Sequence, residues 1–186
     1  MSNFEGDYNK YEYWLAGMFS LSGRKKIYLK TMFGDAKTLY RAKAEVLERI
    51  PVLNAREKEK VQASQSRTEE ELQKSLEYCV QNGILLTSWQ DKSYPERLEN
   101  IYNPPYGLFY RGNLPEWQKP SVGIVGARNC TYYGKTVAEQ IGERLAAAGI
   151  VVVSGMAAGI DGAAQRGALR SGGSTCSVLG CGMRAF

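Results

Sequence analysis

Apolar residues recur at spacings of three and four through the first 82 residues, and this spacing places side chains on one face of an α-helix. A second helix is expected over residues 24–32, ending at Gly34, and Asp35 is a suitable N-cap for the next one. The pattern therefore predicts a series of short helices. The face predicted for the first helix carries Tyr11, Trp14, Leu15, Met18 and Phe19.

Residues 54–75 are rich in charged and polar side chains, which is typical of a solvated face rather than of a binding surface. A helix expected over residues 68–81 presents Leu72, Leu76 and Val80 at a spacing of four. Asn82 and Gly83 end it, since glycine readily adopts the left-handed conformation that follows many helices. We therefore expect residues 1–82 to form one helical domain that includes a charged connector.

The pattern becomes extended after Gly83. Residues 84–87 and 108–110 are short apolar runs of the kind that form strands. Between them, Pro104 and Pro105 restrict the chain to an extended conformation. We expect the second of these strands to lie at an edge beside a larger sheet.

Two further apolar runs, residues 122–125 and 150–153, each end in glycine and small polar residues that begin a helical pattern. Adjacent βα units of a parallel sheet have this form. The predicted fold class is therefore α/β, with a helical N-terminal domain followed, over residues 83–186, by a Rossmann-like parallel sheet.

A parallel sheet of this kind binds ligands where its strands end and its helices begin. Helix N-termini offer free N–H groups and a partial positive charge, so two of them at one sheet edge form a site for an anion. Phosphate is the anion that we expect there.

The distribution of charge is compatible with this site. The chain has 24 basic and 19 acidic residues, a net charge of +5, which by itself is common. Residues 119–186 contain seven basic and three acidic residues, a surplus of four. A basic turn over residues 22–26 has two interpretations: it grips a DNA backbone, or it is a solvated turn between packed helices, which we favour.

The cysteines at positions 79, 130, 176 and 181 form no C-x-x-C pair, and the chain has no histidine. A structural zinc site is therefore not expected, and neither is a catalytic pair of serine or cysteine with histidine. No apolar run of 18 residues and no signal-peptide pattern occurs. These features predict a cytoplasmic protein with reduced thiols, no cofactor and no membrane contact.

Short motifs follow one another in a characteristic order in the second half of the chain. They are Tyr94-Pro95, Pro104-Pro105, Gly126-x-Arg128, Ser154-Gly155-x-Ala157-x-Gly159-Ile160-Asp161 and Gly180-x-Gly182. Their order and spacing resemble the DprA/Smf family of DNA-processing proteins over about residues 84–183. Residues 8–82 are similar only in type to the sterile-alpha-motif-like (SAM-like) N-terminal domain of that family.

The resemblance implies a protein of natural transformation without enzymatic activity. Members of the family bind single-stranded DNA, protect incoming strands and help to load a RecA-type recombinase, and the full-length proteins form homodimers. For this chain, these properties are expectations. The anion site predicted from the residues agrees with them, because a phosphate pocket on such a sheet suits a nucleic-acid backbone.

The first predicted loop of the phosphate site follows residues 122–125. Gly126 lets the chain turn sharply, and the planar guanidinium of Arg128 suits a phosphate, an assignment that relies on the resemblance. The alternatives for Arg128 are an ion pair with Asp161 and stacking on Tyr132. Thr131 and Gly134 either contact the ligand or only cap the following helix and let the chain pack closely.

The second loop follows residues 150–153. We expect the Ser154 hydroxyl and the Gly155 N–H to bind the same or a neighbouring phosphate, with Gly159 continuing the loop. Asp161 is expected to support the site, by capping the next helix or by orienting Arg128, rather than to contact DNA. Lys135 adds positive charge or is simply solvated. Tyr132 and Tyr133 stack on bases or belong to the core, and the core is favoured.

The chain departs from the family pattern at three places. Ala127 replaces a usual serine, and Gln165 replaces a usual histidine, so that only an amide is present there. Family members also continue beyond Gly182, whereas this chain ends at Phe186. We therefore expect only the N-terminal part of the Rossmann-like domain and an exposed apolar sheet edge.

Two other functions remain open from the sequence. A Rossmann-like nucleotide-binding enzyme, similar to the phosphoribohydrolases, has a comparable first βα turn, but the Pro-Gly-Gly loop and the glutamate of that class are missing. A dinucleotide site is also disfavoured, since Ser154 occupies the place where an acidic residue holds the ribose. The helical N-terminal region is also compatible with a protein-interaction scaffold.

Overall fold

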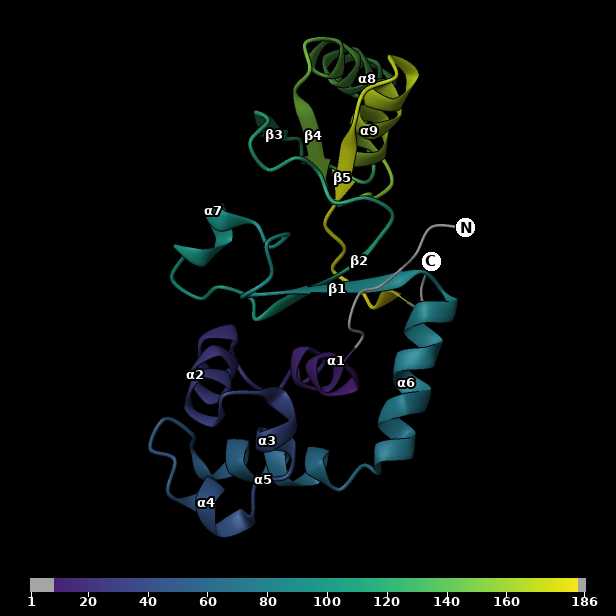
Figure 1. The fold of residues 1–186 in the computed structure, drawn as a ribbon. Helices are drawn as coiled ribbons and strands as arrows, with labels where there is room; N and C mark the ends of the chain where they lie inside the picture. The colour runs from purple at the N-terminus through teal and green to yellow at the C-terminus, as the bar shows by residue number, and fades with distance from the viewer. Residues whose placement is uncertain (1–8, 184–186) are drawn as a thin grey trace. The chain divides into compact units, whose positions relative to one another are not determined.

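The computed structural model describes residues 9–183, and the chain divides into two compact units, Met1–Gly112 and Asn113–Phe186 (Figure 1). The first unit is helical with a two-stranded sheet, and the second contains a parallel three-stranded sheet with helices. This confirms the predicted fold class of a helical N-terminal region followed by a parallel α/β sheet. Arg184 and Phe186, on which two of the expectations rest, lie outside the described residues.

Asp35 caps the helix that follows it, as the sequence predicted. Asp35 accepts a hydrogen bond from the Thr38 amide at 2.7 Å, and Thr68 forms a reciprocal capping box with Glu71. The helices are α1 (Lys10–Ala16), α2 (Gly23–Phe33), α3 (Ala36–Tyr40), α4 (Ala44–Glu48), α5 (Ala55–Gln65), α6 (Glu69–Gln81) and α7 (Glu96–Glu99).

One apolar cluster holds these helices together. Its fully buried members include Leu15, Leu29, Leu39, Leu47 and Leu72, which come from five different helices. Phe19 is an exception to the predicted first face, since it is 87% exposed. It lies beyond the end of α1, where the helical spacing that placed it inward no longer holds.

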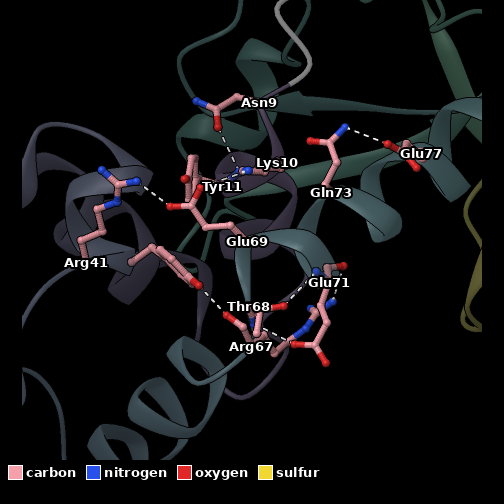
Figure 2. A network of polar contacts seen from close by, with 11 residues as sticks. Asn9, Lys10, Tyr11, Arg41, Arg67, Thr68, Glu69, Glu71, Gln73 and Glu77 are labelled. Atoms are coloured by element: carbon pink, nitrogen blue, oxygen red, sulfur yellow. Dashed lines mark hydrogen bonds and ion pairs between the residues drawn. The ribbon is translucent and has the colours of Figure 1, made fainter.

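Figure 2 shows how the start of α6 is tied to α1 and α3 through Glu69. The Glu69 carboxylate pairs with Arg41 and, at 3.3 Å, with Lys10. Hydrogen bonds from Arg41, Tyr11 and Lys10 lower the pKa of Glu69 to about 2. The pair with Arg41 is exposed to solvent, so it fixes the geometry more than it contributes to stability.

Lys25 and Lys26 of the basic turn, and Lys30 further along α2, contact other residues of the protein. Lys25 donates to both oxygens of Glu57, at 2.8 and 2.6 Å, and Lys30 pairs with Glu12. Lys26 is buried and donates to the Ala16 carbonyl at 2.7 Å; burial lowers its pKa to about 8. These contacts support the interpretation of a turn between packed helices.

The expected edge position of the strand at residues 108–110 is wrong. β2 (Gly107–Arg111) pairs antiparallel with β1 (Ile84–Ser88), in a register that sets Ile84 opposite Arg111. The hairpin is held to the helices by buried Tyr106, whose hydroxyl donates to the Glu12 carboxylate, and by an edge contact between the rings of Tyr13 and Phe109 at 5.7 Å. These helical contacts explain why β2 does not join the parallel sheet.

The second compact unit begins at Asn113, whereas the sequence placed a domain boundary between residues 82 and 83. The hairpin of β1 and β2 lies between these two positions. The division into domains at residue 82 stays a prediction.

The second unit contains β3 (Ser121–Gly123), α8 (Tyr132–Ala147), β4 (Val151–Ser154), α9 (Ile160–Arg170) and β5 (Thr175–Ser177). The strands are parallel in the order β3-β4-β5, with Val152 of β4 fully buried between the outer two. Figure 1 shows α8 and α9 side by side against the sheet. Val122, in the outer strand β3, is exposed to solvent, and so is Val178, which directly follows the other outer strand, β5.

Two glycines let α8 and α9 approach very closely. A Cβ atom at Gly142 would lie 2.0 Å from the Ala164 carbonyl oxygen, and one at Gly167 would lie 2.0 Å from that of Glu139. The buried residues of α8 and α9 beside this contact are mostly alanines, with Leu145 and Ile160 packed against them. The helix pair is thus positioned by backbone contact rather than by large side chains, and it fixes where the N-termini of both helices lie.

Within residues 9–183, no helix is long and apolar enough to cross a membrane. The same residues contain no group of three or more potential metal ligands, and the four cysteines are free.

Candidate functional site

The ends of β3 and β4 bring two loops and two helix N-termini together. A Cβ atom at Gly126 would lie 2.6 Å from Cβ of Ile160, and Gly134 also faces the Ile160 side chain. The start of α9 therefore fits against both the first loop and the start of α8. This is the neighbouring arrangement of strand ends that the sequence predicted.

Gly159 holds the loop that carries Arg128. Its φ angle is +92°, and a Cβ atom there would lie 2.2 Å from the Ala127 carbonyl oxygen and 2.4 Å from that of Arg128. The Ile160 amide donates to the same Ala127 oxygen at 3.2 Å. Only glycine fits this position, so the second loop sets the path of the first.

Asp161 joins the two loops through its carboxylate. One oxygen accepts from the Gly126 amide at 3.0 Å, and the other accepts from the Gly155 amide at 3.2 Å. The side chain is 6% exposed. Asp161 thus holds the two loops together. It is not the N-cap of α9, which is Gly159, and the described residues show no ion pair between Asp161 and Arg128.

Ser154 is buried beneath these loops. Its hydroxyl donates to the Ile124 carbonyl at 2.6 Å, which adds a link between the ends of β4 and β3. The Ser154 hydroxyl and the Gly155 amide, both expected to bind phosphate, therefore have protein partners here. Met156 follows with φ of +56°, a conformation that is strained for a residue with a side chain.

Arg128, Thr131 and Lys135 are exposed around the start of α8. Thr131 is the N-cap, and its hydroxyl accepts from the Gly134 amide at 3.1 Å, so the predicted cap is confirmed. The first turn of α8 contains no acidic residue. Within residues 9–183, the Arg128 side chain has neither an ion pair nor a ring to stack on, so both alternatives considered for it are absent.

Tyr132 and Tyr133 are 86% and 77% exposed, so their expected place in the core is wrong. The inward stripe of α8 runs instead through Gly134, Ala138, Gly142 and Ala146 at a spacing of four. The two tyrosines lie off this stripe. That run of small residues was visible in the sequence and would have revealed the exposed side.

Gln165 lies one helical turn after Asp161 and closes the contact of α9 with β5. Its side-chain nitrogen donates to the hydroxyls of Thr175 and Ser177 and to the Cys176 carbonyl, at 3.1, 2.8 and 3.3 Å. The amide oxygen is buried without a partner among the described residues. Sequence reasoning noted this glutamine as a departure but did not predict its structural role.

Comparison with known proteins identifies the family. The model of the family described as DNA recombination-mediator protein A matches residues 85–186, which is more than half of the chain. The chain is 43% identical over 96 residues to the DNA processing protein DprA of Streptococcus pneumoniae, covering 52% of this chain and 34% of that protein. It is 34% identical over 140 residues to DprA of Bacillus subtilis, covering 72% and 47%.

A solved structure extends the similarity to the helical region. The structure of DNA processing protein A from Streptococcus pneumoniae superposes with a TM-score of 0.70 and 26% identity, covering 96% of this chain and 60% of that one. The chain thus spans between a third and a half of the length of the two relatives above. The family match and the shared fold together show that the chain belongs to the DNA recombination-mediator protein A family, also called DprA/Smf.

Proposed function

We propose that this chain binds single-stranded DNA through its phosphate backbone at the loop of Arg128 and the start of α8. The observation that carries this proposal is the exposed guanidinium of Arg128, which has no ion pair within residues 9–183, on a loop whose path is fixed by contact with Gly159. A planar guanidinium binds phosphate with two parallel hydrogen bonds, and a fixed loop loses little freedom on binding. Membership in a family of recombination mediators supports DNA as the source of the phosphate.

The predicted site residues take two roles in this proposal. Arg128 and Lys135 supply positive charge. Thr131 and Gly134 lie at the start of α8, whose N-terminal amides face the DNA strand in this proposal. Gly126, Ser154, Gly155, Gly159 and Asp161 hold the loops in place through the contacts described above. The proposal thus moves Ser154 and Gly155 from contact with phosphate to support of the loop.

The wider role that we propose is that of the family: protection of incoming strands in the cytoplasm and help in loading a RecA-type recombinase, with a homodimer as the form of the longer proteins. We place no reaction at the site. The chain has no histidine, and the only carboxylate that the described residues bring to both loops, Asp161, is buried on two amides. A group held in this way is poorly placed to transfer protons.

The test measures binding of a fluorescent oligo-dT strand by anisotropy at several salt concentrations. Arg128→Ala is expected to weaken binding about tenfold, the effect of losing roughly 1.4 kcal/mol of a charge-assisted hydrogen bond. The slope of log affinity against log salt is expected to fall by about 0.7, because one phosphate contact is lost. Arg144→Ala is the matched control, since Arg144 is an exposed arginine in the last turn of α8. Equal losses in the two variants, or none in Arg128→Ala with an intact fold, would remove Arg128 from the site.

A further inference from the structure

Two aromatic rings lie open to solvent beside the proposed phosphate site. Tyr132 and Tyr133 are the first two residues of α8, directly after the loop of Arg128 and the Thr131 cap. Both rank among the most exposed large side chains of the second unit. Within the described residues, neither ring stacks on another ring or lies under a cation. Packing in a core therefore does not explain why two aromatic side chains are present at the start of α8.

The charges around the pair are complementary to an anionic aromatic ligand. Arg128 precedes the two tyrosines and Lys135 follows them, and the first turn of α8 has no acidic residue. If the two tyrosines only packed against an apolar partner, the positive charges of Arg128 and Lys135 on either side would not contribute to binding. A strand of nucleotides carries phosphates and flat aromatic bases in alternation, which is the combination that this surface offers to bind.

We infer that Tyr132 and Tyr133 form a stacking platform for unpaired nucleobases, next to the phosphate contact at Arg128. This inference rests on the proposed function, since it names a second point of contact for the same strand. Stacking on a tyrosine requires an open base face, and a duplex hides its base faces between neighbouring pairs. The platform would thus give the site its preference for single strands, which phosphate contacts alone do not supply.

The test compares two strands of equal length: oligo-dT, and an abasic strand that has the same sugar-phosphate backbone without bases. The wild-type chain is expected to bind oligo-dT about tenfold more tightly than the abasic strand, the usual scale for stacking of one base on an aromatic side chain. The double variant Tyr132→Ala with Tyr133→Ala is expected to lose this preference. Its affinity for the abasic strand and its salt dependence stay unchanged, because the phosphate contact remains.

Two control variants separate stacking from structural effects. Replacing both tyrosines by phenylalanine keeps the rings and is expected to keep the preference for oligo-dT. Tyr102→Ala removes an equally exposed tyrosine of the first unit and is expected to change neither affinity. Circular dichroism of each variant confirms that α8 is intact.

The outcomes are distinct for the two proposals. A preference for oligo-dT that persists in the double alanine variant overturns the platform, and so does an equal loss of affinity for both strands, which would make the tyrosines supports of the loop. If the wild type binds oligo-dT and the abasic strand with equal, salt-dependent affinity, the platform is overturned but the proposed phosphate contact is not. If the wild type binds neither strand at low salt, the proposed function and the platform both fail.

Discussion

The carboxylate of Asp161 accepts a hydrogen bond from the backbone amide of Gly126, 3.0 Å away across the ends of two parallel strands. The second carboxylate oxygen accepts from the Gly155 amide, so one side chain fixes both loops. Backbone amides at strand ends often bind phosphate, but here an internal anion occupies two of them. The Asp161 carboxylate thus joins the two loops of the candidate site.

Asp161→Asn is expected to destabilise the second unit by about 2 kcal/mol, because an amide group replaces one charge-assisted acceptor by a donor that faces an N–H. Denaturant unfolding measures this change. Affinity for oligo-dT should fall as well, since the Arg128 loop loses its anchor. Glu116→Gln is the control: Glu116 is an exposed acidic residue of the same unit, and its pair with Lys119 contributes little. Wild-type stability in Asp161→Asn would refute the anchoring role.

Gly142→Ala is expected to destabilise the pair of α8 and α9 by about 3 kcal/mol, because the new Cβ atom meets the Ala164 carbonyl. The sign of the change in stability distinguishes steric overlap from helix propensity. Alanine forms helices better than glycine by about 1 kcal/mol, so helix propensity alone predicts stabilisation. Gly123→Ala in β3 is the matched control, since a Cβ atom there meets nothing within 4 Å. Thermal or denaturant unfolding that ranks Gly142→Ala at or above the wild type would contradict the close packing.

Lys26 makes the free energy of unfolding of the first unit depend on pH in the alkaline range. Burial lowers its pKa to about 8, whereas an unfolded lysine titrates near 10.4. Between these values the unfolded chain binds more protons than the folded chain, so the free energy of unfolding rises with pH. The stability of the wild type relative to Lys26→Met is therefore expected to increase from about pH 8 to pH 10.5, as followed by urea unfolding. Below pH 7 the difference between the two should stay constant; a constant difference throughout would show that Lys26 is not desolvated.

Fragments of the chain test where the first domain ends. Residues 1–112 are expected to fold on their own, because this fragment keeps Tyr106 and the hairpin that pack on the helices. Residues 1–82 are expected to be unfolded or molten, since they lose the buried bond from Tyr106 to Glu12 and the cover over α1. Circular dichroism and amide hydrogen exchange distinguish the two results. Cooperative unfolding of residues 1–82 would confirm the boundary predicted from the sequence.

Local signals in the sequence predicted much of the fold. The predicted caps Asp35 and Thr131 act within three residues, so their positions are readable without knowledge of tertiary structure. The signals for the two βα units also come from residues close together in the sequence. They placed Gly126 and Arg128 in the loop after the first strand, where the structure has them, although β3 ends at Gly123 instead of at Val125.

What the sequence did not reveal depends on partners distant in the chain. The pairing of β2 is decided by contacts with α1 some 90 residues earlier, as in the bond between Tyr106 and Glu12. The role of Asp161 depends on an amide 35 residues earlier, at Gly126. Tyr132 and Tyr133 were assigned to the core from residue type, although aromatic residues close to a helix start are free to face outward.

The internal contacts of Lys25, Lys26 and Lys30 change the meaning of the chain's net charge of +5. A polyanion that diffuses toward a protein is steered by cations that remain unpaired at the surface, not by the formal sum. Within α2, Lys25 and Lys30 are paired with carboxylates at short range, so they add little to that long-range field. The exposed cations Arg128, Lys135 and Arg144 of the second unit, which have no ion pair within the described residues, are therefore expected to contribute more to the rate of encounter than the paired Lys25 and Lys30.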